Sequence, residues 1–158
     1  MIREKIESVL ARRCTLLCVG PMSVPCVDAV TELANEYNVP LTLIASRRQI
    51  DSAEFGGGYV NNWTTEACAK YVIDRDANDR VILARDHGGP WQSEVERKAG
   101  LSLHRAMESA KASYRADIDA GFQVLHLDPS IDIHAKPTPD DVLERVYELY
   151  EFCHSYAE

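Results

Sequence analysis

The sequence lacks an excess of positive charge, and this excludes whole classes of partner. Seventeen Lys and Arg residues stand against 25 Asp and Glu residues, which gives a formal net charge of −8. Proteins that bind the phosphate backbone of nucleic acids carry a basic footprint, and anionic membrane surfaces attract the same kind of charge. We therefore expect neither nucleic acid nor a membrane among the partners of this chain.

The sequence also lacks an apolar run that approaches the roughly 18 residues needed to cross a bilayer. Four of its first seven residues are charged, and this segment does not contain the apolar stretch of a secretory signal. The five cysteines form no CxxC pair, which excludes the zinc-ribbon and thioredoxin motifs. We therefore predict a cytoplasmic protein whose cysteines are free thiols packed as small apolar side chains.

A glycine-rich phosphate loop is missing after the first apolar, β-rich run, where residues 20–23 read Gly-Pro-Met-Ser. The glycines of residues 55–59, Phe-Gly-Gly-Gly-Tyr, could form a phosphate-binding nest, but they match neither the P-loop nor the dinucleotide-binding spacing. No nucleotide cofactor is expected. A stand-alone flavodoxin-like module that binds a nucleotide remains an alternative.

Four short apolar runs predict the strands of a parallel sheet. Each is almost continuously apolar, which is typical of strands that are buried on both faces. The runs cover residues 15–20, 41–46, 80–85 and 123–128.

Helical patterns lie between and around these runs. Proline in the first turn and Ser or Thr at the N-cap mark helices that begin near Ser23 and Thr138, and Thr64 or Thr65 can cap another. Residues 2–12 and 102–120 carry apolar residues at helical spacing. Strands that alternate with helices predict an α/β protein with right-handed crossovers, and residues 1–158 form a single domain.

Two loops are longer than a crossover requires, and both follow a strand at the end where parallel α/β proteins bind ligands. One begins at residue 47 and the other at residue 86. In the second, Asp86 and His87 could supply a general acid/base and a metal ligand, or they could form a turn with a surface imidazole. Asp128 ends the fourth strand in the same way, with His126 on the same side of that strand; a loop cap and a core histidine are the alternative.

Residues 80–90 and 120–130 resemble two motifs of the tagatose-bisphosphate aldolase accessory-subunit family. Residues 49–64, which contain Gly57 and Gly58, resemble a third segment of that family. Its members pair with a class II aldolase in galactitol and N-acetylgalactosamine catabolism. The resemblance implies a (β/α)8 barrel, of which this chain would be the N-terminal half, because such a barrel takes about 250 residues and this chain has 158.

The resemblance also implies roles for individual residues. Asp86 would be the catalytic acid/base, His87 a ligand of a divalent metal, expected to be zinc, and Asp128 a second catalytic acid. Where the family has a strand acid and an Asn, this chain has Ile44 and Arg48, which suggests a more anionic substrate. The predicted substrate-binding residues are Ser46, Arg47, Arg48, Gln49, Gly57 and Gly58. Two solvated loop arginines are the alternative for residues 47 and 48.

The sequence leads to two principal hypotheses for function. The first is a lyase of the aldehyde-lyase class that performs retro-aldol cleavage, or a related proton abstraction, on a phosphorylated or acidic sugar. The second is a non-catalytic partner subunit that stabilises a class II aldolase. A half-barrel leaves both edge strands unpaired, so we expect a homo-oligomer or an aldolase partner subunit.

Overall fold

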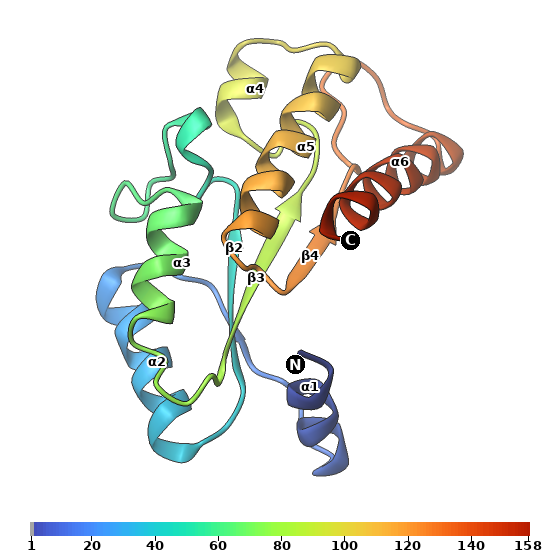
Figure 1. Ribbon diagram of the computed structural model, residues 1–158. Helices are drawn as coiled ribbons and strands as arrows, with labels where there is room; N and C mark the ends of the chain where they lie inside the picture. Colours follow the sequence, from blue (N-terminus) through green and yellow to red (C-terminus); the bar gives the residue numbers. More distant parts are fainter. Residues whose placement is uncertain (1) are drawn as a thin grey trace.

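The computed structural model describes residues 2–158 and contains one parallel β-sheet (Figure 1). The strands lie in the order β1-β2-β3-β4, and each pairs with its sequence neighbour in parallel. They are β1 (Cys18–Val19), β2 (Leu41–Ser46), β3 (Val81–Gly88) and β4 (Val124–Leu127). The order confirms the predicted sequential α/β arrangement of a half-barrel. It also excludes the 2-1-3-4 order that the flavodoxin-like alternative requires.

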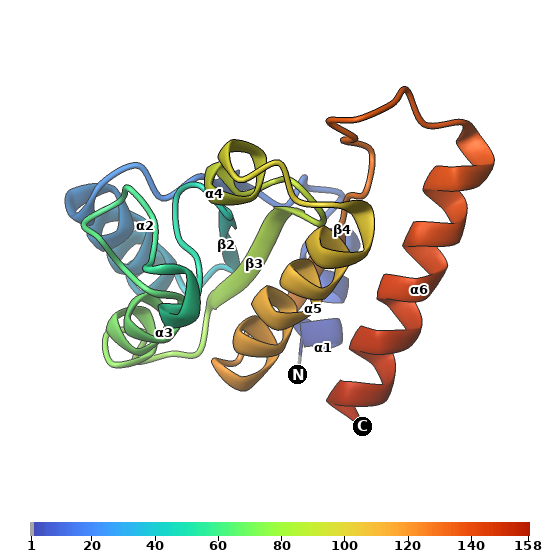
Figure 2. The ribbon, with the colours of Figure 1, turned by 90° about the horizontal axis from the view of Figure 1, so that it is seen from above.

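An arc of helices covers the outer face of this sheet, as the view from above shows (Figure 2). It consists of α2 (Val24–Tyr37), α3 (Thr65–Ile73), α5 (Leu103–Asp119) and α6 (Pro139–Ala157). Helix α1 (Ile2–Ala11) lies apart from this arc, at the amino ends of the strands, and the short α4 (Glu94–Lys98) follows β3 (Figure 1). Helix α4 and a 3₁₀ turn at Ala53–Phe55 lie in the two long loops, where no helix was predicted. Both are too short to show a helical period. No helix within residues 2–158 is long and apolar enough to cross a membrane.

The predicted caps account for where three of the helices begin. Ser23 accepts a hydrogen bond from the backbone of Cys26, and Thr64 accepts one from Ala67. At the start of α6, Thr138 and Asp141 cap each other's backbone N–H groups in a capping box. Strand β1 is shorter than predicted, because only two of its residues pair with β2.

The apolar core lies between the sheet and the arc of helices. Leu43 and Ala45 of β2 and Leu83 of β3 belong to one cluster with α2 and α3. Cys68 of α3 lies in this cluster, and burial raises the pKa of its thiol to about 12. All five cysteines are free thiols.

A fully buried arginine, Arg85 of β3, lies among these apolar residues. Its guanidinium donates two hydrogen bonds to Asp117 of α5, at 2.8 and 2.5 Å, and others to the Thr65 hydroxyl and the carbonyls of Ala45 and Ile50. Burial alone lowers the pKa of Arg85, but the Asp117 carboxylate outweighs this effect and raises it. The ion pair thus ties β3, β2 and two helices together.

A second buried arginine, Arg47, fastens the two long loops to each other. Its guanidinium donates to Asp51 at 3.1 Å, to Glu96 of α4 at 2.6 Å and to the carbonyl of Gly89 at 3.1 Å. Ser113 of α5 donates to the same Asp51. Buried charges require such complete pairing, so the positions of both loops are fixed by this one side chain.

We predict that Asp117→Asn destabilises the fold by about 3–5 kcal/mol, because it leaves the charge of Arg85 buried without a partner. Urea unfolding at neutral pH measures the change. Asp119→Asn, two residues further along the same helix and exposed, is the control and should cost within about 0.5 kcal/mol. Equal stability of the two variants would contradict the proposed role of the ion pair.

We also predict that the chain associates through the open side of the sheet, which is the face that the arc of helices does not cover, together with the edge strands β1 and β4. Within residues 2–158 the outer edges of β1 and β4 have no strand partner, and Val124 and Leu17 are 38% and 57% exposed. Burial of apolar area stabilises an interface by roughly 25 cal/mol per Å². Sedimentation at micromolar concentration should therefore show species larger than 17.7 kDa. A sharp monomer that unfolds cooperatively would contradict this expectation.

Candidate functional site

The carboxyl ends of β2, β3 and β4 bring several of the predicted residues together. Ser46 at the end of β2 pairs in register with Asp86 of β3. A pocket of about 340 Å³ opens beside them. Its walls are formed by Ser46, Arg48, His87, Gln92, Asp128, Ser130 and Ile131.

The end of β3 has an irregular backbone that exposes the site side chains. The register with β4 shifts between Arg85 and Gly88, and His87 within this bulge has a left-handed φ of 43°. Gly89 follows with φ 152°, and a Cβ there would lie 2.2 Å from the carbonyl oxygen of Asp128. A non-glycine residue held at positive φ is strained, and such strain often accompanies functional sites.

The imidazole of His87 is held by the carboxylate of Asp128. His87 Nδ1 lies 2.7 Å from Asp128 Oδ2, to which Gln92 also donates at 2.8 Å. The other oxygen, Oδ1, accepts hydrogen bonds from the hydroxyl and backbone N–H of Ser130. The hydrogen bond to Asp128 raises the pKa of His87, against a smaller effect of burial. Burial would raise the pKa of Asp128, but its hydrogen bonds from Ser130 and His87 lower it.

These contacts bear on the predicted roles of the two aspartates. Asp128 accepts hydrogen bonds on both oxygens, which suits a carboxylate that orients His87 better than one that exchanges protons. The Asp86 side chain is 33% exposed, with Oδ2 3.6 Å from His87 Nε2. Asp86 is not among the residues that line the pocket, and it is the freer of the two carboxylates to move a proton.

His126 of β4 joins this group from the neighbouring strand. Its Nδ1 lies 3.3 Å from Asp86 Oδ1, and its ring centroid lies 5.6 Å from that of His87. Single ligand atoms of Asp86, His87 and His126 all lie within 4.8 Å of one another. This donor set, two imidazoles and a carboxylate, suits a divalent transition metal.

Arg48 is the exposed cation of the pocket. Its guanidinium makes no hydrogen bond or ion pair with the described residues, and its charge opposes protonation of His87. Arg97 of α4 donates to the carbonyl of Gln92, in the pocket wall, at 3.3 Å. Burial and then the charge of Arg48 lower the pKa of Arg97, so two like charges lie near each other here. Such a pair favours an anion at the pocket mouth.

The structure places four of the predicted substrate-binding residues away from the pocket surface. Arg47 is buried in the ionic network described above, so no ligand reaches its guanidinium in this arrangement. Gln49 is 9% exposed and accepts hydrogen bonds from the backbone and hydroxyl of Ser46, which it orients. Gly57 and Gly58 do not line the pocket. A Cβ on Gly58 would lie 2.1 Å from the carbonyl of Gln49, so this glycine allows the loop to pack against residues 49 and 50.

Five residues of the site are not among those predicted from the sequence. His126 has both a functional and a core interpretation there, and Gln92, Arg97, Ser130 and Ile131 are not singled out. The alternation that puts His126 and Asp128 on one side of β4 was the only available signal for His126. Gln92 and Arg97 lie in a loop and in a five-residue helix, which show no pattern.

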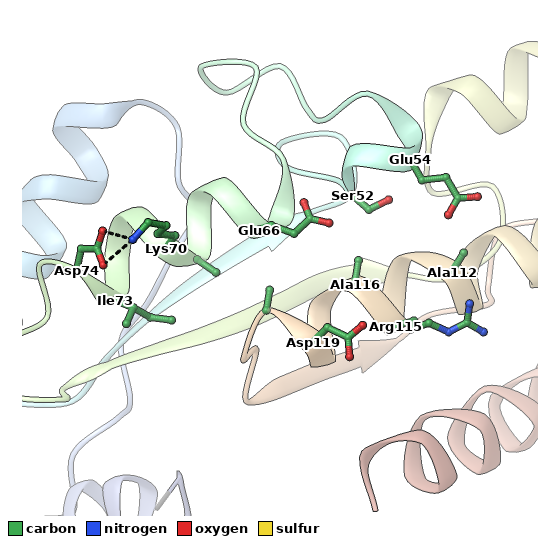
Figure 3. Close-up of a pocket in the computed structure, with 12 residues that line it drawn as sticks. Ser52, Glu54, Glu66, Lys70, Ile73, Asp74, Ala112, Arg115, Ala116 and Asp119 are labelled. Atoms are coloured by element: carbon green, nitrogen blue, oxygen red, sulfur yellow. Dashed lines mark hydrogen bonds and ion pairs between the residues drawn. The ribbon is translucent and has the colours of Figure 1, made fainter.

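A larger hollow, of about 580 Å³, lies between α3 and α5 on the outer surface (Figure 3). None of the predicted site residues lines it. Four of its charged side chains have partners of their own: Lys70 pairs with Asp74, Asp119 accepts a hydrogen bond from Tyr156, and Arg115 stacks over that tyrosine's ring. The predicted site residues therefore lie at the carboxyl ends of the strands and not in this larger hollow.

Comparison with known proteins supports the family resemblance. The sequence is 36% identical over 86 residues to the D-tagatose-1,6-bisphosphate aldolase subunit GatZ of Escherichia coli (strain SMS-3-5 / SECEC), and equally to that of Shigella boydii serotype 18. Each match covers 51% of this chain and 19% of the relative. The chain thus matches only about a fifth of the length of these curated relatives. No family model matches the sequence.

A solved structure shares the fold over most of the chain. It is described as a probable tagatose 6 phosphate kinase from Sinorhizobium meliloti 1021, and it matches with a TM-score of 0.73 at 23% identity. The match covers 89% of this chain and 36% of that one. At this identity the likeness shows the fold alone. The GatZ match shows that the sequence resembles tagatose-bisphosphate aldolase subunits. The structural match shows that the α/β fold of this chain also occurs as part of a longer protein.

The contact between His87 and Asp128 generates a pH prediction. Asp128→Asn should lower the pKa of His87 toward its ordinary value of about 6.5, because the carboxylate that stabilises the imidazolium is lost. The stability that this charge pair adds to the native protein should be fully present below about pH 6.5 and be lost as the pH rises through the raised pKa.

Titration of the histidine resonances by NMR measures the shift. His104, exposed on α5, is the internal control, and its resonances should be the same in both proteins. An unchanged His87 in the variant would show that Asp128 does not hold its charge.

Proposed function

We propose that this chain is part of a sugar-phosphate aldolase-type subunit that acts in carbohydrate metabolism. The observation that carries the proposal is the contact of His87 with both Asp86 and Asp128 at the carboxyl ends of the strands, within a sequence similar to tagatose-bisphosphate aldolase subunits. The proposed reaction is retro-aldol cleavage of a phosphorylated or acidic sugar, or a related proton abstraction beside a carbonyl.

Each side chain has a distinct part in this proposal. Asp86 accepts the proton of the substrate hydroxyl as the adjacent carbon–carbon bond breaks. Asp128 keeps the proton of His87 on Nδ1, so that Nε2 faces Asp86 with its lone pair free. A divalent metal held by His87, with zinc expected, would polarise the substrate carbonyl. Ser46, oriented by Gln49, offers a hydroxyl to the sugar.

Arg48 is the proposed contact for the anionic group of the substrate. It is exposed in the pocket wall and has no ion-pair partner among the described residues. The whole chain carries a net charge of −8, so a local pair of arginines is needed to draw an anion to this end of the sheet.

A partner-subunit role is the second candidate, because the curated relatives are themselves named as aldolase subunits. In that role the same side chains would persist as structure, and the open side of the sheet would be covered by the assembled complex. Metal analysis together with a turnover screen on phosphorylated sugars separates the two candidates. Turnover by this protein favours the first, whereas stabilisation of a class II aldolase without turnover favours the second.

We predict that Asp86→Asn lowers turnover by about 10²–10⁴-fold, the range for loss of a general acid/base. The melting temperature should change little, because this side chain is partly exposed and does not pack in the core. A variant that unfolds but retains its specific activity would show that Asp86 is structural.

Arg48→Ala should raise KM for a phosphorylated sugar about tenfold or more while kcat changes little, since the contact stabilises bound substrate and transition state alike. Arg105→Ala, an exposed arginine on α5, is the matched control. A KM that moves equally in both variants would remove Arg48 from the site.

A further inference from the structure

We infer that His126 is a metal ligand, and that Asp86, His87 and His126 form a metal-binding site complete within this chain. The inference deepens the proposed function, and rests on it for His87. The family resemblance offered only His87, since the further histidine ligands of the aldolases would lie in the half of the barrel that this chain does not supply. The two histidines come from adjacent strands, β3 and β4, and the carboxylate lies between them.

The hydrogen bonds of His87 leave one nitrogen available as a ligand. Its Nδ1 lies 2.7 Å from Asp128 Oδ2, and an ionised carboxylate can only accept, so the proton belongs on Nδ1. The neutral ring then carries its lone pair on Nε2, which faces Asp86 Oδ2 at 3.6 Å. A carboxylate that fixes the tautomer of a histidine in this way is the usual second layer of a metal site.

The same reasoning applies to His126. The backbone N–H of His87 donates to His126 Nδ1 at 3.4 Å, and in the tautomer that accepts this hydrogen bond Nδ1 also carries a lone pair. Nδ1 lies 3.3 Å from Asp86 Oδ1, which is another acceptor. Two acceptors that face each other repel unless a cation or proton lies between them. The long hydrogen bond from the His87 backbone to His126 Nδ1 is weak, so a cation can replace it.

The spacing of the three groups fits one ion. Their ligand atoms lie within 4.8 Å of one another, against about 3.3 Å between ligands that bind tetrahedral zinc at 2.0–2.1 Å. Small side-chain rotations close this gap, since the His87 and His126 side chains are 55% and 51% exposed. A metal bound through one Asp86 oxygen leaves the second oxygen free for proton transfer. Two imidazoles and one carboxylate favour Zn²⁺ or a similar first-row divalent ion.

Metal titration of the 158-residue chain tests the inference without any substrate. Calorimetry with Zn²⁺, and the visible absorption of Co²⁺ as a spectroscopic probe, should show one equivalent per chain. His126→Ala and His87→Ala should each weaken binding at least tenfold, and Asp128→Asn should weaken it about 10–100-fold. His104→Ala, which removes an exposed histidine of α5, is the control and should bind as the native chain does.

Two results would overturn the inference: no stoichiometric binding by the native chain, or undiminished binding by His126→Ala. If His126→Ala proves unfolded by circular dichroism, His126→Gln, which retains the side-chain bulk, replaces it in the same titration. Tight binding without turnover would reject the proposed catalysis and retain the metal site. Turnover by the native chain, together with undiminished metal binding by His126→Ala, would retain the proposed catalysis and reject the metal site.

Discussion

The charge of Arg85, buried beneath the sheet, is the constraint on which the rest of this structure depends. A guanidinium in this position requires an opposite charge and several acceptors, and Asp117 with the carbonyls of Ala45 and Ile50 supplies them. These partners come from β2, from the loop after it and from α5. The ion pair therefore holds β3 in register with its neighbours. Arg85 directly precedes Asp86 in this strand.

The positions of the site residues follow from this anchoring. Arg47 extends the same buried polar layer and holds the carbonyl of Gly89 and the carboxylate of Glu96. Both ends of the segment that carries His87 are thus fixed, by Arg85 before it and by Arg47 after it. The bulge between them can then keep the left-handed backbone of His87, which a mobile loop would relax.

The open side of the sheet gives the site its chemical character. Outer-face side chains are packed under helices, whereas Asp86 and His126 remain partly exposed on the other face. Imidazole nitrogens and carboxylate oxygens converge there beside the positive charge of Arg48. This combination is the basis on which an anionic substrate is proposed; the curated relatives are named as D-tagatose-1,6-bisphosphate aldolase subunits.

The sequence by itself determined the succession of strands and helices along the chain, because continuous apolar runs alternate with capped helical patterns. It also predicted that Asp86, His87 and Asp128 would meet, since the carboxyl ends of parallel strands lie at one edge. Only the tertiary structure distinguished Arg47 from Arg48. These neighbours are chemically identical, and the one that turns inward is selected by Asp51 and Glu96. His126 likewise acquired a role only when β3 brought Asp86 beside it, a contact between residues 40 positions apart.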